Sequence, residues 1–243
     1  MIRLILTVLF VTVFLILSIP IFLIESIIGL FNEHARDISS LRIVQWAFRV
    51  VILIGGIKVT TIGEENIPKE TGVIYVGNHR SFYDIITTYP RCPGLTGYMA
   101  KIEILKVPLL STWMKRLHCL FVDRKDLRSG IRVIQDSIDL LNKGISVCIF
   151  PEGTRNTTED TLLEFKAGAF RAAQKSGAPI VLMAINNSRA ALEEHFPKIR
   201  PTHIVIEYSE PIDPASIEGG YKGLSAYCKD RLKTMVENNE KLV

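Results

Sequence analysis

Two apolar stretches separated by a short polar segment occupy the start of the chain. The first, 4–24, contains no charged residue and is long enough to cross a bilayer, which takes about 20 residues. The second, 43–57, is shorter and carries Arg49, so it suits a helix in the membrane interface better than a spanning helix. The polar residues 32–42 between them predict a turn. Residues 1–57 are therefore expected to form a membrane-anchoring hairpin of two helices.

Two other interpretations of this N-terminal pattern are weaker. The apolar core of a secretory signal peptide is shorter, about 7–15 residues, and a small-residue cleavage site follows it, which this chain lacks. A buried pair of helices in a protein core is the second interpretation, and it is weaker because few helices of soluble proteins are apolar on all sides. The four cysteines are far apart and have no C-x-x-C spacing, which indicates reduced thiols facing the cytosol. We therefore expect a membrane-associated protein whose functional site faces the cytoplasm.

From residue 58 onward, short apolar runs rich in β-branched residues alternate with segments of helical periodicity. The apolar runs predict five strands, at 71–78, 119–124, 145–150, 179–185 and 203–208. The periodic segments predict four helices, at 81–89, 129–144, 164–177 and 221–240. Apolar strands that alternate with helices are typical of an α/β fold, here a mostly parallel central sheet flanked by helices. We expect this sheet to form one domain over residues 58–243.

Polar residues gather directly after two of the predicted strands. His79 follows the first strand, and the segment Pro-Glu-Gly-Thr-Arg-Asn at 151–156 follows the third. Functional groups in parallel sheets collect beyond the carboxyl ends of the strands, which lie at one edge. The histidine and the 151–156 segment are therefore expected to share one site.

His79 and Asp84 stand five positions apart, and the spacing has two interpretations. Ser81 and Asp84 match the S-x-x-D capping box that starts a helix, which would explain the carboxylate without any chemistry. Alternatively, a turn of the chain at Ser81 would let Asp84 accept the ring N–H of His79 and leave the other ring nitrogen free as a base. The two roles are compatible.

The loop after the third predicted strand has four residues that suggest a phosphate-binding turn: Pro151, Glu152, Gly153 and Arg155. Glycine permits close backbone approach, and the arginine fork fits a phosphate group. An ordinary tight turn with solvated charges is the alternative. Arg124 is either half of an Asp–Arg surface pair or a phosphate ligand. Lys101 and Glu103 could form a solvated helix face.

Composition narrows the classes of partner. The formal charge of +4 favours an anionic partner such as phospholipid head groups. Nucleic acid is not expected, because the chain has no long run of Lys and Arg and no recognition-helix spacing. The sequence has no G-x-S-x-G, Walker or G-x-G-x-x-G motif and no cluster with metal-ligand spacing. Neither a metal nor another cofactor is expected.

Taken together, these motifs resemble the 1-acyl-sn-glycerol-3-phosphate acyltransferases (lysophosphatidic acid acyltransferases) among the glycerolipid acyltransferases. The family's N-H-x4-D block is matched by residues 78–84, its F-[IV]-D-R block by 121–124 and its F-P-E-G-T-R block by 150–155. The segments AKIEIL and FKAGAF resemble two further blocks, A-K-x-E-L and F-K-x-G-x-x. The ordered set lies within residues 71–185.

The resemblance implies transfer of a fatty acyl group, from acyl-CoA or acyl-carrier protein, to the sn-2 hydroxyl of lysophosphatidic acid. The product would be phosphatidic acid, a precursor in phospholipid synthesis. His79 would act as general base on this hydroxyl, with Asp84 fixing its tautomer. Lys101, Arg124 and Arg155 would hold the phosphate of the acceptor. Glu152 and Gly153 would shape the adjoining loop and orient the glycerol. Thr154, which follows them, would also bind the substrate.

Three alternatives to this activity stay open. An acyltransferase of the same fold could use another acceptor, such as glycerol-3-phosphate or a different lysophospholipid. A membrane-bound lipid-binding module would bind the acceptor without turnover. A thioesterase would release thiol without any acceptor.

Overall fold

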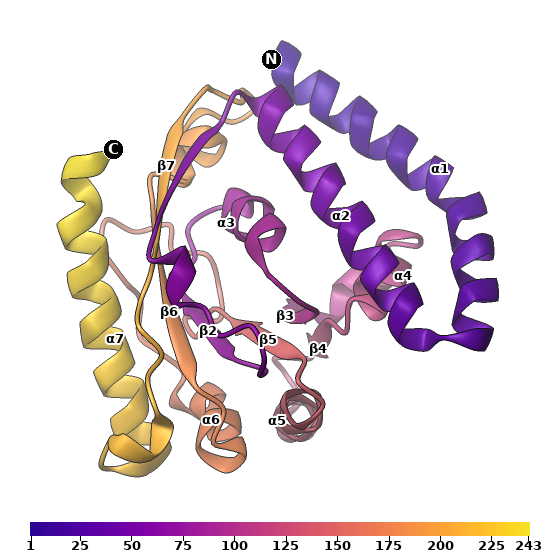
Figure 1. Ribbon diagram of the computed structural model, residues 1–243. Helices are drawn as coiled ribbons and strands as arrows, with labels where there is room; N and C mark the ends of the chain where they lie inside the picture. Colours follow the sequence, from indigo (N-terminus) through magenta and orange to yellow (C-terminus); the bar gives the residue numbers. More distant parts are fainter.

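The computed structural model describes residues 1–243, the side chain of Leu127 excepted, and its centre is a seven-stranded sheet (Figure 1). The strand order is β1-β7-β6-β2-β5-β3-β4. Five adjacent strands run parallel to one another: β6, β2, β5, β3 and β4. Strand β7 pairs antiparallel with β6, and the edge strand β1 pairs parallel with β7. The predicted mostly parallel α/β sheet is confirmed. The strands are β1 (Lys58–Ile62), β2 (Ile74–Gly77), β3 (Thr96–Lys101), β4 (Leu120–Val122), β5 (Ser146–Ile149), β6 (Ile180–Asn186) and β7 (His203–Tyr208).

Two of these strands, β1 and β3, are absent from the sequence prediction. Strand β1 lies at the edge of the sheet, reads KVTTI and is only partly buried, so it lacks the apolar run of a central strand. Strand β3 ends at the exposed Lys101. Lys101 and Glu103 do not share a helix face, the alternative left open for them: the first residue ends a strand, and the second lies in the short 3₁₀ helix η3 (Ile102–Lys106).

Helices cover both faces of the sheet, because alternate strand residues point to opposite sides. Along β2, Tyr75 joins one core cluster with α2 (Glu33–Gly55), α3 and α4, whereas Ile74 and Val76 join a second cluster with α5, α6 and α7. Figure 1 shows the two helical layers on either side of the strands. The helices after the hairpin are α3 (Phe82–Thr88), α4 (Leu110–Arg116), α5 (Leu127–Asn142), α6 (Arg171–Ser176) and α7 (Gly220–Asn239).

Helix α6 is much shorter than the predicted helix at 164–177. The backbone N–H of Lys166 donates to the carbonyl of Pro151 at 2.9 Å, and the N–H of Leu163 donates to the Glu152 carboxylate at 2.8 Å. These bonds tie the segment before α6 to the loop after β5. Tertiary hydrogen bonds therefore override the helical pattern there.

The N-terminal hairpin consists of α1 (Ile2–Phe31) and α2 (Glu33–Gly55). The predicted polar turn at 32–42 is wrong, because only Asn32 separates the helices and its side chain accepts the N–H of Ala35 at 3.0 Å as a cap. The polar residues that follow stay helical because they are partnered. The Asp37 carboxylate lies 2.9 Å from Nε2 of His118, and Ser40 donates to Glu25 at 2.9 Å.

Both hairpin helices are long and apolar enough to cross a membrane. Helix α1 leaves most of its apolar side chains exposed, while α2 buries Leu41 and Val44 against the α/β core. The expected boundary at 57/58 falls between the end of α2 and the start of β1. Because α2 shares its core with the sheet, the division into two domains stays an interpretation.

Candidate active site

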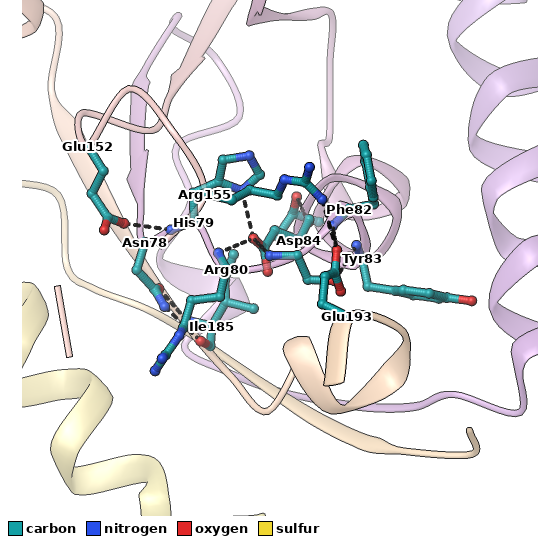
Figure 2. A network of polar contacts seen from close by, with 12 residues as sticks. Asn78, His79, Arg80, Phe82, Tyr83, Asp84, Glu152, Arg155, Ile185 and Glu193 are labelled. Carbon is teal, nitrogen blue, oxygen red and sulfur yellow. Dashed lines mark hydrogen bonds and ion pairs between the residues drawn. The ribbon is translucent and has the colours of Figure 1, made fainter. Parts of the chain in front are cut away.

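His79 and Asp84 lie in contact at the carboxyl end of β2. The chain leaves β2 at Gly77, turns through His79 and enters α3 after Ser81. Nδ1 of His79 lies 2.7 Å from Oδ2 of Asp84 (Figure 2). The same carboxylate oxygen accepts the backbone N–H groups of Arg80 and Ser81, each at 2.8 Å. The predicted capping box is confirmed, so one buried carboxylate both caps the helix and holds the imidazole.

These contacts fix the orientation of the His79 ring. A carboxylate can only accept, so Nδ1 carries the proton and Nε2 keeps its lone pair in the neutral ring. No described residue forms a hydrogen bond with Nε2. The ring stacks on Phe150 with centroids 4.4 Å apart, and the side chain is 17% exposed. Nε2 is therefore the ring nitrogen that can take a proton from a substrate.

The Glu152 carboxylate joins the histidine loop to the loop after β5. One oxygen accepts the backbone N–H of His79 at 2.7 Å, and the other accepts that of Leu163 at 2.8 Å. The N–H of Asn156 donates to the His79 carbonyl at 2.6 Å. The backbone N–H and C=O of His79 are thus both hydrogen-bonded to residues of the loop after β5. This geometry agrees with a role for Glu152 in shaping the loop, since backbone groups occupy both of its oxygens.

Burial raises the pKa of the Glu152 carboxyl above its ordinary value of 4.5, against the opposing effect of the two backbone N–H donors. A carboxyl whose pKa is higher in the folded than in the unfolded chain binds its proton more tightly when folded. Its contribution to stability is therefore full below about pH 4.5 and is lost as the pH rises through the folded-state pKa.

We expect Glu152→Gln to lower the free energy of unfolding at pH 7 by about 1–3 kcal/mol, because the amide nitrogen cannot accept a backbone N–H. Denaturant titration in detergent measures the change. Because the pKa of Glu152 is raised in the folded chain, the difference in unfolding free energy between wild type and variant should be larger near pH 4 than at pH 7. The exposed neighbour Glu159→Gln serves as control and should stay within about 0.5 kcal/mol of wild type. An E152Q protein as stable as wild type would contradict the two-acceptor role.

Gly153 is required by the backbone of this loop. Its φ of +72° lies in the left-handed region, and a Cβ there would come within 2.8 Å of Nζ of Lys166. The Lys166 side chain therefore lies close to this turn, in the space that a Cβ would need. Thr154, next in the chain, is exposed.

Arg155 is held in place by Phe82 and Glu193. Its guanidinium lies 3.9 Å over the Phe82 ring, and Nη1 is 3.2 Å from the Glu193 carboxylate. Glu193 also accepts the Ser81 hydroxyl at 2.6 Å and the Phe82 N–H at 2.8 Å. Figure 2 shows this carboxylate beside the start of α3. Sequence reasoning missed Glu193, since no motif marks it.

Asn78 is a second residue whose role the sequence did not reveal. Its amide donates to the carbonyl of Ile185 and accepts the N–H of Ile185, both at 2.8 Å. The buried side chain therefore mimics a backbone strand pair between β2 and β6, and it fixes the point at which β2 ends. Its place directly before His79 in the N-H-x4-D block was the available signal.

Lys101 and Arg124 lie at the carboxyl ends of β3 and β4, the same edge of the sheet as His79 but farther from β2 in the strand order. Lys101 ends β3 and pairs in register with Val122 of β4, two residues before Arg124. Both side chains are exposed, and neither forms an ion pair with any described residue. In the strand order, β5 separates β2 from β3. The structure thus brings together His79, Asp84, Glu152 and Arg155, and leaves these two cations at the rim.

Comparison with known proteins identifies a matching family and several sequence relatives. A family model described as Acyltransferase matches residues 58–186. A "Probable 1-acyl-sn-glycerol-3-phosphate acyltransferase" of Mycoplasma pneumoniae is 32% identical over 181 residues, covering 69% of this chain and 67% of that protein. The 1-acyl-sn-glycerol-3-phosphate acyltransferase of Borreliella burgdorferi is 34% identical over 142 residues, covering 58% and 56%. That of Saccharomyces cerevisiae is 32% identical over 182 residues, covering 70% and 56%. The chain thus spans little more than half the length of two of these relatives and 67% of the other.

A solved structure shares the fold. The crystal structure of the 1-acyl-sn-glycerophosphate acyltransferase PlsC from Thermotoga maritima matches with a TM-score of 0.73 at 22% sequence identity. The match covers 98% of this chain and 99% of that one, so it extends over the N-terminal helices as well as the sheet.

Proposed function

The chain belongs to the acyltransferase family, and we propose that it transfers a fatty acyl group to the sn-2 hydroxyl of lysophosphatidic acid, giving phosphatidic acid. The acyl donor is acyl-CoA or acyl-carrier protein. The family resemblance inferred from the motifs agrees with the relatives found. The observation that carries the proposal is the 2.7 Å contact between Nδ1 of His79 and the buried Asp84 carboxylate, which leaves Nε2 available.

The chemistry follows from this geometry. Nε2 of His79 takes the proton of the sn-2 hydroxyl as its oxygen attacks the thioester carbonyl carbon. The tetrahedral intermediate collapses with cleavage of the C–S bond, and the imidazolium returns its proton to the leaving thiolate. Asp84 holds the tautomer and stabilises the imidazolium. No covalent acyl-enzyme is required, and general base catalysis of this kind contributes about 10²–10⁴-fold.

The basic residues at the sheet edge are proposed to bind the phosphate of the acceptor. Arg155 presents a planar guanidinium beside the catalytic pair, and such a fork can contact two phosphate oxygens at once. Lys101 and Arg124 are exposed at the ends of the next strands. Gly153 and Thr154 line the turn between Glu152 and Arg155, and we assign them to orienting the glycerol.

We expect Arg124→Ala to raise the KM for lysophosphatidic acid about 10-fold or more, because a charge-assisted hydrogen bond contributes about 1.5–3 kcal/mol. The kcat should change little, since the lost contact is present in both ground state and transition state. Initial rates over a range of acceptor concentrations measure both constants. Lys143→Ala, an exposed cation at the end of α5, is the control. An unchanged KM in R124A would remove its assignment.

A panel of acceptors tests the substrate assignment. Purified protein would be assayed with lysophosphatidic acid, glycerol-3-phosphate and a lysophospholipid with a larger head group, each with acyl-CoA and with acyl-carrier protein. We expect lysophosphatidic acid to give the highest kcat/KM with at least one donor. Preference for glycerol-3-phosphate or for the larger lysophospholipid would assign the chain to another acceptor within the same fold.

The hairpin is proposed to hold the site at the membrane. Both the acceptor and the product carry long acyl chains and reside in a bilayer, and α1 presents an apolar surface along its length. We propose that the bilayer is the cell membrane and that the active site faces the cytoplasm, where acyl-CoA and acyl-carrier protein occur.

A further inference from the structure

Residues 102–110, which link β3 to α4, expose an apolar patch that neither the hairpin nor the site accounts for. Four large apolar side chains in this segment are exposed: Ile102 (37%), Leu105 (36%), Val107 (45%) and Leu110 (38%). Single exposed apolar residues are ordinary on protein surfaces. A cluster within one short segment is typical of a surface that contacts a partner or a membrane.

The backbone of this 102–110 segment is held in a defined shape. The N–H of Val107 donates to Ile104 at 3.0 Å, closing η3, and the N–H of Ser111 donates to Val107 at 3.0 Å, opening α4. Between them Leu109 has a φ of +65°, a conformation that costs energy for a branched residue. The apolar side chains are therefore presented by an ordered segment.

Helix α4 fixes the 102–110 segment relative to the hairpin. The indole N–H of Trp113 donates to Ser18 of α1 at 2.8 Å. The indole ring packs against Phe14 and Phe22, with centroids 5.7 and 4.7 Å away. One turn later, Arg116 donates to the Phe22 carbonyl at 3.0 Å. The exposed apolar side chains of the segment and of α1 thus belong to one packed unit.

The charges around the segment suit an anionic lipid surface. Lys101 and Lys106 bracket Ile102 and Leu105, and Arg124 and Lys125 follow the neighbouring strand β4, between Asp123 and Asp126. The opposing charge within the segment is the exposed Glu103. Apolar side chains flanked by lysines, whose stems extend toward lipid head groups, are typical of elements that lie in a membrane interface.

We propose that the 102–110 segment is a second membrane contact, in which its four apolar side chains enter the lipid while Lys106 and the preceding Lys101 meet anionic head groups. With α1 as the first contact, this second one sets the tilt of the α/β domain on the bilayer. The segment starts where β3 ends, so the carboxyl edge carrying His79 faces the lipid and the acceptor reaches it without crossing water. This last consequence rests on the proposed function; the contact itself does not.

The contact is tested by a depth measurement on the full-length chain. A fluorophore is attached at Leu105→Cys, and its quenching by nitroxide lipids is measured in vesicles of phosphatidylcholine and phosphatidylglycerol. Leu23→Cys on α1 and Ile131→Cys on α5 are matched exposed apolar positions, 66% and 65% exposed. Labelling of the unsubstituted chain, whose cysteines are buried apart from the half-buried Cys119, sets the background.

We expect quenching at positions 105 and 23 and none at 131. Position 105 unquenched, as at 131, would overturn the proposal and point to a protein partner for the patch. If neither position 105 nor position 23 is quenched, the proposal is also overturned, since α1 would then make no membrane contact next to the segment.

A paired activity measurement tests the effect on substrate entry. Leu105→Ser with Val107→Ser should lower the rate toward lysophosphatidic acid embedded in vesicles about fivefold or more, because two exposed apolar side chains no longer contribute to the lipid contact. The rate toward a short-chain acceptor dissolved in water should stay at the wild-type value, as should both rates of Ile131→Ser. Equal rates in vesicles would contradict the role in entry. If the wild type is inactive with both acceptors, the proposed function is refuted, while the depth measurement still decides whether the segment contacts the membrane.

Discussion

Replacing His79 with alanine is expected to lower kcat for acyl transfer by about 10²–10⁴-fold, the usual contribution of a positioned general base. Nε2 is the atom of this site that can accept the hydroxyl proton, and alanine removes it. The fold should survive, because Asp84 keeps the backbone N–H groups of Arg80 and Ser81 as donors. Steady-state rates at saturating donor and acceptor measure the loss.

The control for this variant is His34→Ala, which removes an exposed histidine near the hairpin turn. It should keep the wild-type rate. The unfolding free energy of H79A should fall by no more than about 3 kcal/mol, the upper range for one hydrogen bond to a charged group. A folded H79A protein that turns over at the wild-type rate would end the proposal that His79 is the base.

Substitution of Asp84 is expected to have the second large effect, and two variants separate its two roles. Asp84→Asn can keep an acceptor oxygen for His79, Arg80 and Ser81 but loses the charge that stabilises the imidazolium. We expect it to lower kcat by about 10⁴-fold, the loss seen for the same substitution in a serine protease triad, where the imidazole is left in the wrong tautomer. Asp84→Ala should lose a similar rate and also about 1–3 kcal/mol of stability, because buried N–H groups lose their acceptor.

Rates and denaturant midpoints of both variants decide between the two roles. Full activity in D84N together with reduced stability in D84A would mean that the carboxylate serves only as a helix cap. Loss of activity in both, with the stability loss larger in D84A, would support both roles together.

Much of the site could be predicted from local pattern. The apolar runs before His79 and Glu152 identified β2 and β5, and parallel pairing of those strands places the two loops side by side. The capping box at Ser81 predicted the turn that brings Asp84 to the imidazole. These inferences succeeded because strand apolarity and helix capping depend on residues close together in the chain.

The missed features depend on contacts between distant segments. Glu193 holds Arg155 and the start of α3 from an irregular segment after β6, where no local pattern signals a partner. Residues 33–42 looked like a turn because they are polar, yet Asp37 finds His118 in the α/β domain and the helix continues. Edge strand β1 carries too little apolar character to be distinguished from a loop.

The most direct test of the central claim is a stoichiometric assay of purified protein with acyl-CoA or acyl-carrier protein, with and without lysophosphatidic acid. Thiol released and phosphatidic acid formed are counted in the same reaction. We predict one thiol for each phosphatidic acid and essentially no thiol without the acceptor, since the acceptor hydroxyl is the attacking group. Thiol release without acceptor, or acceptor binding without any thiol release, would contradict direct acyl transfer at His79.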